Sequence, residues 1–344
     1  MNKDYVNRYS DIGMKMNAIQ RRAFNKFNEY VYFNRIKLEI IEECFCSGKD
    51  FSLLSRYDRF GLPFGTQVCK KCGLITQNIR ISEASMELFY NEIYWDLISG
   101  KSRKIEFSTP PKTDDASAFI LQVLKESDFE RLRIFEVGCG SGDRIFQLAN
   151  MLNLKGVHTE SFGCDYSDNA LFIAESKGIR TVKGGFSEIA QYGKADVLIL
   201  SHLFEHLTDL NLALSQIDGL CHENTIIYVE LPGIIDLNNK KEYMYNYQDY
   251  NVLAHTYNFS LTTLSFVFAT KNFALVHGNE FVRAVFRKSP IDKVIIDVSD
   301  SYNQVVKALA IAKDKDVIFQ RKLNRPYVRY LKNIVKAILN QSSC

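Results

Sequence analysis

Four cysteines in the first quarter of the chain have the residue type and spacing of metal ligands. Cys44 and Cys46 are separated by 22 residues from Cys69 and Cys72. Four thiolates arranged in two such pairs are typical of a tetrahedral structural Zn²⁺ site. The segment between the pairs contains several glycines and only short apolar runs, so a bound metal would supply stability that its small core cannot. We therefore predict that these cysteines bind structural Zn²⁺.

A glycine-rich loop with a later acidic residue forms a second candidate site. Residues 135–143 read FEVGCGSGD, between a predicted strand and a predicted helix. Glycines at this spacing allow a sharp turn and leave room for a ligand at the helix N-terminus. Asp165 ends the next predicted strand, where a carboxylate can accept hydrogen bonds from a ribose diol, and Tyr166 can cover an adenine face. Together these residues predict a site for a ligand that contains ribose and adenine.

Histidines follow another predicted strand, in the segment SHLFEHL at residues 201–207. Ligands bind outside the carboxyl ends of strands in an open α/β sheet, so Ser201, His202 and His206 are expected near the ligand. An imidazole there is suited to substrate binding or proton transfer. Two histidines four residues apart could instead bind a metal, although no third ligand is evident, or make structural hydrogen bonds.

A third histidine, His255, follows a tyrosine-rich insertion and precedes a predicted helix. This position suits the wall of an active site, with tyrosines of the insertion stacking on a sugar or base. The tyrosines concerned are Tyr243, Tyr245, Tyr247 and Tyr250. The alternative is that His255 caps or packs beneath the insertion.

The elements that position these residues follow an alternating pattern. Apolar strands are predicted at 132–137, 161–164, 180–183, 196–200 and 225–231, separated by helical patterns at 141–153, 167–177 and 207–217. A helix at 260–269 and strands at 274–276 and 281–286 complete the set. This order predicts a doubly wound α/β domain, with a mainly parallel sheet between two layers of helices.

The rest of the chain divides into an N-terminal part and a C-terminal extension. Residues 1 to about 43 are expected to be mainly helical, 44–72 to form the small cysteine module, and 82–94 to form a helix. A polar link at 109–112 places a boundary near residue 110. The predicted parts are therefore 1–110, 111–288 and 289–344.

Composition excludes several classes of protein. The chain has 344 residues, of which 46% are hydrophobic and 24% charged, and its formal net charge is +3. These values exclude disordered, collagen-like and small disulfide-stapled proteins, and they do not favour binding of nucleic acid over the whole surface. No stretch approaches the roughly 18 apolar residues of a membrane helix, and the first residues lack the apolar core of a signal peptide, so a cytoplasmic location is expected.

The C-terminal extension ends in a basic amphipathic pattern. Residues 317–344 contain six basic residues and no acidic ones, and apolar residues recur there at helical spacing. This predicts a surface helix or a helix that packs in a homodimer. Peripheral contact with a membrane or another polyanion is the alternative.

The glycine loop and Asp165 together resemble the class I S-adenosylmethionine (SAM)-dependent methyltransferases. The resemblance implies a Rossmann-like seven-stranded domain over about residues 115–288, with SAM as cofactor. It places Glu136 beside the methionine amino group, and the loop of Gly138, Cys139, Gly140 and Gly142 against the cofactor. Asp165 would hold the ribose. Phe186 and Ser187 fall where such enzymes contact the adenine edge; because residues 185 and 186 are not acidic, that contact would come from the backbone or Ser187.

The cysteine module resembles the N-terminal zinc-binding module of bacterial methyltransferases of sugar and polysaccharide biosynthesis, which include nucleotide-deoxysugar C-methyltransferases. The residues that carry this resemblance, besides the cysteines, are Asp50-Phe51, the segment YDRFGLP at 57–63, the segment CKKCGL at 69–74, and Phe89-Tyr90. In the C-methyltransferases a Glu-His pair deprotonates carbon at the position of Ala254-His255. The alanine here favours a hydroxyl acceptor.

These inferences combine into one expected function. We expect a SAM-dependent methyltransferase that methylates a sugar or nucleotide-sugar intermediate of surface-polysaccharide biosynthesis, with O-methylation favoured. Deprotonation of the acceptor would be assisted by His255 first and His206 second, with His202 nearby. The helix at 82–94, with Trp95, could close over the cofactor. Alternatives are a sugar C-methyltransferase, an RNA or protein methyltransferase, and a non-catalytic SAM-binding scaffold.

Overall fold

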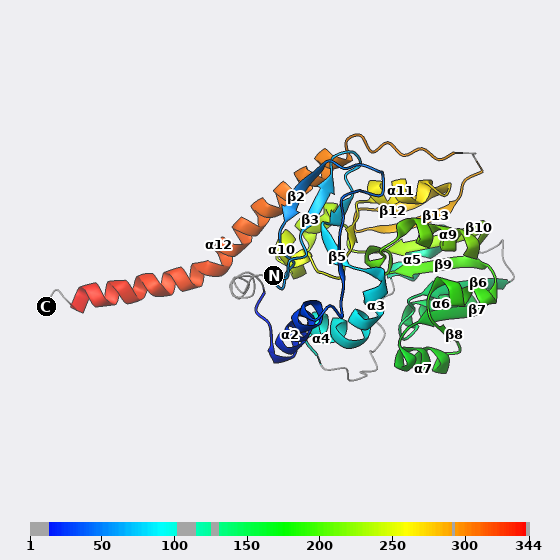
Figure 1. The fold of residues 1–344 in the computed structure, drawn as a ribbon, viewed down its shortest axis with the longest axis horizontal. Coiled ribbons are helices and arrows are strands. Elements are labelled where there is room, and N and C mark those ends of the chain that lie inside the picture. The colour runs from blue at the N-terminus through cyan, green and yellow to red at the C-terminus, as the bar shows by residue number, and fades with distance from the viewer. Residues whose placement is uncertain (1–13, 102–114, 125–130, 291–292, 342–344) are drawn as a thin grey trace.

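A seven-stranded sheet forms the centre of the molecule, which we describe from a computed structural model. The structure describes residues 14–101, 115–124, 131–290 and 293–341, with side chains as far as residue 322. The strand order is β12-β13-β10-β9-β6-β7-β8 (Figure 1). β13 pairs antiparallel with both of its neighbours, whereas the pairs from β10 to β8 are parallel. The strands are β6 (Arg131–Val137), β7 (His158–Asp165), β8 (Arg180–Lys183), β9 (Ala195–Ser201), β10 (Cys221–Glu230), β12 (Phe273–Asn279) and β13 (Arg283–Lys288).

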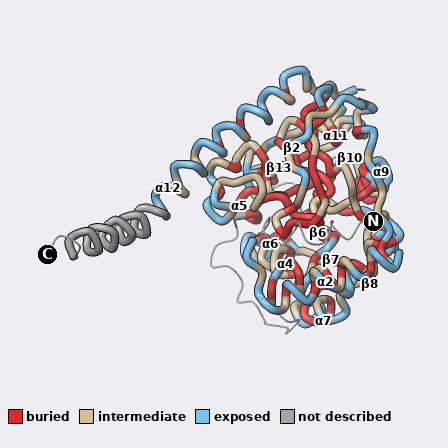
Figure 2. Tube along the Cα trace, turned by 60° about the vertical axis from the view of Figure 1, so that its left-hand side comes forward, coloured by how far each residue is buried: buried red, intermediate tan, exposed pale blue. Residues whose placement is uncertain are grey.

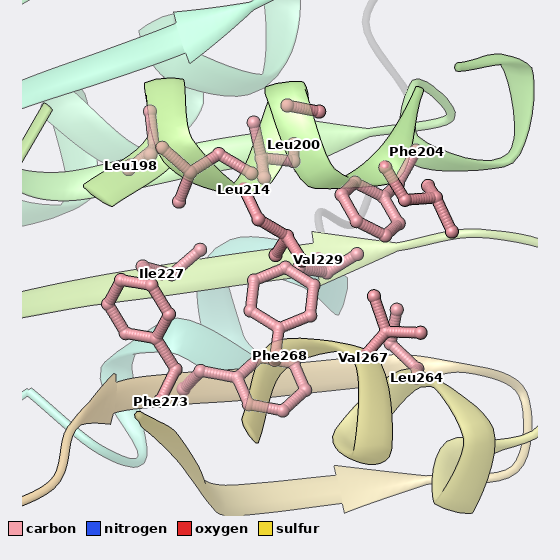
Figure 3. Close-up of a cluster of buried hydrophobic side chains, with 14 of the residues drawn as sticks. Leu198, Leu200, Phe204, Leu214, Ile227, Val229, Leu264, Val267, Phe268 and Phe273 are labelled. Carbon is pink, nitrogen blue, oxygen red and sulfur yellow. The ribbon is translucent and has the colours of Figure 1, made fainter. Parts of the chain in front are cut away.

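Helices cover both faces of this sheet, because successive side chains of its strands enter two different cores. Along β6, Leu132 and Ile134 pack in one core, while Phe135 and Val137 pack in the other. The first core lies under α5 (Asp115–Leu121) and α6 (Asp143–Leu154). The second lies under α9 (Leu210–Leu220) and α11 (Leu261–Ala269), whose side chains meet those of β9 and β10 (Figure 3). The predicted doubly wound α/β fold is confirmed.

Two further helices follow the strands β7 and β8. α7 (Asp168–Ser176) follows β7, and α8 (Phe186–Ile189) follows β8. Ser167 caps α7 by accepting a hydrogen bond from the Ala170 amide. An N-cap serine of this kind fixes where a helix begins.

In the described residues, the N-terminal part begins with a helix that is followed by two small sheets. Helix α2 (Ala18–Tyr32) precedes a two-stranded sheet of β1 (Leu38–Ile40) and β5 (Ile79–Ile81). The other sheet has the order β11-β4-β3-β2, with β2 (Phe51–Ser55), β3 (Thr66–Cys69) and β4 (Ile75–Gln77). Its fourth strand, β11 (Tyr257–Asn258), comes from the predicted methyltransferase region and pairs with β4. The two parts therefore share a sheet, across the predicted division of the chain; the predicted boundary near residue 110 lies outside the described residues.

The predicted helix at 82–94 is present but changes its winding. It consists of α3 (Glu83–Phe89), a π-helical turn η1 (Tyr90–Tyr94) and α4 (Trp95–Ser99). The segment ends at Gly100, whose left-handed backbone angle of 64° is typical of a helix C-terminus. A π-helical turn shifts the side chains that follow it by one position, and such turns are frequent at functional sites.

The tyrosine-rich insertion packs beneath the long C-terminal helix α12 (Ser301–Gln341). Tyr250 is buried and its hydroxyl donates to the Pro232 carbonyl, and the Tyr247 hydroxyl donates to Thr66. Tyr245 contacts Phe319 of α12 edge to face. The prediction that Tyr250 stacks on a substrate is therefore wrong, because its ring is buried in this core, whereas stacking by the partly buried Tyr247 stays a prediction.

Helix α12 continues past the body of the molecule (Figure 1). As far as residue 322, many of its residues are exposed to solvent (Figure 2). The side chains of the basic pattern beyond residue 322 lie outside the described residues. Among the residues that the structure describes, we find no helix with the length and apolar content needed to cross a membrane.

Candidate active site

The glycine loop after β6 has an open face. Gly138, Gly140 and Gly142 all have left-handed backbone angles, with φ of 72°, 52° and 71°. A side chain built on Gly140 would meet nothing within 4 Å, and one on Gly138 would meet only Leu203, at 3.5 Å. The backbone at Gly138 and Gly140 is thus accessible to a ligand, which is the property that the sequence pattern predicted.

Gly142 and Cys139 lie on the packed side of the same loop. A Cβ on Gly142 would come within 2.3 Å of Ile179 and 3.1 Å of Ala174. The buried Cys139 thiol occupies the space beside Gly163, where a Cβ would approach its sulfur to 2.6 Å. These two residues hold the loop against its neighbours, and their contact with a cofactor stays a prediction.

Asp165 connects the end of β7 to the glycine loop. One carboxylate oxygen accepts from the Gly140 amide at 3.0 Å, and the other accepts from the Ser167 amide at 2.8 Å. Each oxygen keeps a further lone pair, so the carboxylate can still bind a diol. Tyr166 follows immediately and is 65% exposed. The structure therefore brings the predicted ribose and adenine residues together beside Gly140.

Two other predicted cofactor residues stand at strand ends. Glu136 on β6 is buried, and its carboxylate accepts from the Ile145 amide of α6 at 3.3 Å. Ser201 ends β9, in register with Glu230 of β10. Both lie at the carboxyl edge of the sheet, where ligands of such folds bind.

The loop after β8 contains an acidic residue that the sequence analysis missed. Phe186 is buried in the core, and the Ser187 hydroxyl accepts from the Gln216 amide group of α9. Glu188 folds back so that its carboxylate accepts from the Gly185 amide at 2.8 Å. The Tyr166 hydroxyl lies near Gly185, so Glu188, the third residue of α8, brings an acidic group close to the predicted adenine position. The capping spacing from Gly185 to Glu188 was the available signal.

The histidines converge on a buried glutamate. Glu205 and His206 lie in a 3₁₀ turn, η4 (Phe204–His206), just after β9. The Glu205 carboxylate lies 3.8 Å from His206 Nε2 and 3.5 Å from His202 Nδ1. His255 packs edge to face on His206, with ring centres 4.9 Å apart. Glu205 was not among the predicted residues; its place between His202 and His206 in the sequence was the signal.

A tyrosine from the π-helical turn completes this cluster. The Tyr90 hydroxyl lies 3.0 Å from His206 Nδ1, and the same nitrogen lies 2.9 Å from the Ala254 carbonyl oxygen. Because a carbonyl only accepts hydrogen bonds, His206 carries its proton on Nδ1. Tyr94 also contacts the His206 ring. The helical segment predicted to close over the ligand therefore reaches the histidines through Tyr90 and Tyr94.

His255 is held in place by the N-terminal part. The Leu253 amide donates to the buried Asp58 carboxylate, and the Leu253 carbonyl accepts from Gln77. The backbone amide of Gln77 donates to the Thr256 carbonyl. Burial and the neighbouring His206 lower the pKa of His255 to about 3, so its imidazole is neutral near pH 7.

The four predicted metal-binding cysteines form a compact cluster. The sulfur atoms of Cys44 and Cys72 are 3.6 Å apart, as are those of Cys46 and Cys69, and all four lie within 4.8 Å of one another. A disulfide needs about 2.05 Å, whereas four Zn–S bonds of about 2.3 Å in a tetrahedron separate the sulfurs by roughly 3.8 Å. The donor set and its spacing therefore fit a bound Zn²⁺.

Comparisons with known proteins bear on the larger domain. Residues 112–278 match the family model described as "Methyltransferase domain". No curated protein matches the sequence.

Solved structures that resemble the chain include three methyltransferases. A SAM-dependent methyltransferase from Thermotoga maritima is 17% identical, with 51% of this chain and 87% of that chain covered and a TM-score of 0.36. One from Clostridium acetobutylicum is 12% identical, with 58% and 97% covered and a TM-score of 0.38. Human N-acetylserotonin methyltransferase is 15% identical, with 60% and 57% covered and a TM-score of 0.40, so the chain spans little more than half of that enzyme.

The family match, the strand order and the open glycine loop agree. Residues 112–278 therefore belong to a methyltransferase domain built on a Rossmann-like seven-stranded sheet.

Proposed function

We propose that this enzyme transfers a methyl group from SAM to a hydroxyl oxygen of a sugar or nucleotide sugar, an acceptor of the kind used in surface-polysaccharide biosynthesis. The observation that carries the proposal is the position of His206 and His255. They meet just beyond β9, in the turn whose Leu203 side chain borders Gly138 of the open glycine loop. This arrangement supports a position of the two imidazoles beside the predicted methyl donor.

The residues of the loop would hold the cofactor. Gly138 and Gly140 leave room for it, Asp165 offers its free lone pairs to the ribose, and Tyr166 offers an exposed ring to the adenine. SAM supplies a methyl group on a sulfonium, which already has a good leaving group. The protein therefore has to align the acceptor and assist the loss of one proton from its hydroxyl. We assign this assistance to His255 first and to His206 second.

Oxygen is favoured over carbon as the methylated atom because of what stands beside His255. The preceding residue is Ala254, whose carbonyl accepts from His206 and whose side chain carries no acid. Abstraction of a proton from carbon is harder than from a hydroxyl. The hydroxyl is therefore the acceptor that this pair of residues suits.

We propose in addition that Cys44, Cys46, Cys69 and Cys72 bind one structural Zn²⁺. Three of these cysteines are buried in a core shared with the methyltransferase domain, and Phe45 packs edge to face on Phe266 of α11. Elemental analysis of the purified protein should find one zinc per chain. Loss of that zinc in Cys72→Ser with an unchanged content in Cys221→Ser, a buried cysteine on β10, is the expected result; equal zinc in both variants would contradict the site.

The methyl-transfer proposal is tested with isotopically methyl-labelled SAM. Purified protein is incubated with a nucleotide-sugar and glycan extract, and products are analysed by mass spectrometry. We expect a labelled sugar or nucleotide sugar. If the label enters only RNA or protein, or nothing although calorimetry shows SAM binding, the acceptor assignment is wrong.

Asp165 provides a matched check on cofactor binding. Asp165→Asn removes a charged acceptor, and the loss of one charge-assisted hydrogen bond, about 1.5–3 kcal/mol, weakens SAM binding by roughly 10- to 100-fold. Asp168→Asn changes a nearby exposed aspartate that pairs with Lys183, and should bind SAM normally. Calorimetry that finds equal SAM affinity in the two variants would remove Asp165 from the site.

A further inference from the structure

We propose that Glu205, His206 and His255 bind a divalent cation, and that this ion ligates the acceptor oxygen during methyl transfer. The inference rests on the proposed function for the identity of the acceptor, whereas the ion site itself follows from the three side chains. Each of the three residues offers one ligand atom, and these three atoms lie within 4.8 Å of one another.

Histidines are the groups that face the charge of the Glu205 carboxylate, with His202 Nδ1 at 3.5 Å and His206 Nε2 at 3.8 Å. The Glu205 side chain is about 2% exposed, and both oxygens are buried without a hydrogen bond to any residue that the structure describes. Burying an ionised carboxylate without partners is costly, and proteins normally compensate it with a positive charge or a metal. A cation between Glu205 and the imidazoles would supply that charge.

In its neutral form, His206 presents a lone pair rather than a proton to this carboxylate. The neutral ring with its proton on Nδ1, toward the Ala254 carbonyl, has the lone pair of Nε2 on the side of Glu205, 3.8 Å from its oxygen. The His255 Nδ1 atom is also buried without a hydrogen-bond partner among the described residues. Metal-binding histidines commonly donate their second ring nitrogen to a backbone carbonyl, which fixes the ring, and His206 has this arrangement.

The three ligands are held by well-anchored segments. Glu205 and His206 belong to the turn after β9, while His255 is fixed through Asp58 and Gln77 of the N-terminal part. Ligands of one ion bound at about 2.0–2.2 Å lie roughly 3–3.5 Å apart, so binding requires side-chain shifts on the order of 1 Å. Two imidazoles and one carboxylate leave coordination positions of the ion open. These ligands suit Mn²⁺, Fe²⁺, Co²⁺ or Zn²⁺ better than Mg²⁺.

The open side of the cluster is marked by His202. Its side chain is half exposed, its Nδ1 lies 3.5 Å from Glu205, and its backbone is left-handed, with φ of 49°. A non-glycine residue in this conformation is uncommon and is often found at functional sites. A substrate can therefore reach the ion past His202, at the carboxyl end of β9.

This site specifies the acceptor more closely. Two adjacent open positions on the ion fit two neighbouring oxygens, such as the vicinal hydroxyls of a sugar. Binding to a divalent ion lowers the pKa of a hydroxyl, so its proton leaves to solvent. The oxygen lone pair then forms the new O–CH₃ bond as the C–S bond of the sulfonium breaks, and a neutral thioether leaves. In this arrangement His255 and His206 assist deprotonation as ligands.

The test measures binding of Mn²⁺, which has low affinity for thiolates. The full-length protein, with zinc in its cysteine site, is titrated with Mn²⁺, and free Mn²⁺ is followed by electron paramagnetic resonance. We expect one Mn²⁺ per chain, with at least tenfold weaker binding in Glu205→Gln and in His255→Asn. The matched control is His222→Asn, since His222 pairs with Asp196 at the opposite end of β9. Equal Mn²⁺ binding in wild type and all variants, or no binding at all, overturns the inference.

Methyl transfer distinguishes this inference from the proposed function. The zinc-loaded protein freed of other metals should lose most of its activity and regain it with Mn²⁺. Full activity without added metal would overturn the ion site and leave the sugar methyltransferase in place. Mn²⁺ binding that depends on Glu205, without methylation of any sugar, would overturn the proposed function and leave the ion site. SAM binding by calorimetry shows that each variant is folded; if Glu205→Gln does not fold, His255→Asn carries the test.

Discussion

Gly48 stands inside the sulfur cluster without being a ligand. A Cβ at this position would lie 2.9 Å from the Cys69 sulfur and 3.2 Å from the Cys46 sulfur. The Gly48 carbonyl also accepts from the Cys44 amide, which closes the turn of the first cysteine pair. The close approach of the two pairs therefore requires a residue without a side chain.

Gly48→Ala should disturb the cysteine cluster. We expect the variant to lose about 1–3 kcal/mol of unfolding free energy through overpacking, and to release zinc more readily to a colorimetric chelator. Gly219→Ala is the matched control: Gly219 lies in α9 with nothing within 4 Å of its Cβ position, so alanine should stabilise by about 0.5–1 kcal/mol. Similar melting temperatures and zinc release in the two variants would show that Gly48 does not restrict the cluster.

Among the elements, the π-helical turn η1 has a specific positioning role. It places Tyr90 and Tyr94 with ring centres 4.7 Å apart and both against His206. Ile93 and Leu97, which follow in η1 and α4, remain buried in the N-terminal core. The segment thus presents tyrosines to the site from one side and packs its apolar residues on the other.

Tyr90→Phe should affect turnover more than cofactor binding. It removes one hydrogen-bond partner of His206 while keeping the ring, and the loss of a hydrogen bond worth about 0.5–1.5 kcal/mol should lower kcat by roughly 2- to 10-fold. SAM affinity from calorimetry should be unchanged, since Tyr90 is not part of the glycine loop. An unaltered kcat would mean that the hydroxyl does not orient the imidazole.

The strands of the large sheet were predictable because their apolar runs are continuous. Strand β8 has the predicted bounds. Strand β6 begins one residue earlier than predicted, and β9 is one residue longer at each end. β7 begins at His158, three residues before its prediction, because it starts with polar residues that periodicity does not mark as strand. The two-residue strand β11 has no sequence signal of its own; it exists because β4 offers it an edge.

The candidate site was predictable only where it is local in sequence. The glycine loop and Asp165 are near one another in the chain and in a recurrent strand-turn-helix unit. The partnership of Glu205 with His255 depends instead on how the N-terminal part positions residues 251–258. No local pattern contains that information, so a third ligand for His206 was not evident from the sequence.

At the scale of the whole molecule, the first turns of α12 join the N-terminal sheet to the tyrosine insertion. Val305 and Ala312 are buried, and the Tyr302 hydroxyl lies 2.9 Å from Ser52 of β2. Lys315 donates to the Asn238 carbonyl of the insertion. The beginning of the helix is therefore part of the core, although its later turns extend beyond it (Figure 1).

Val305→Ala should destabilise the protein, whereas Val306→Ala should not. Val305 is 1% exposed and Val306 is 39% exposed, and the two substitutions change helix propensity equally. We expect a loss of about 1–3 kcal/mol at position 305, from lost burial and the resulting cavity, and no loss at 306. Denaturant unfolding measures both; equal midpoints would mean that α12 does not pack on the body in solution.

The shared sheet has a consequence for synthesis on the ribosome. β2, β3 and β4 leave the ribosome early, but the strand that covers the edge of β4 is not made until Asn258 has been translated. At roughly 5–20 residues per second, this delay is on the order of ten seconds or more. During that time β4 exposes an unpaired edge, the kind of surface that invites aggregation. Early Zn²⁺ capture by the cysteines would hold the nascent module together until its last strand arrives.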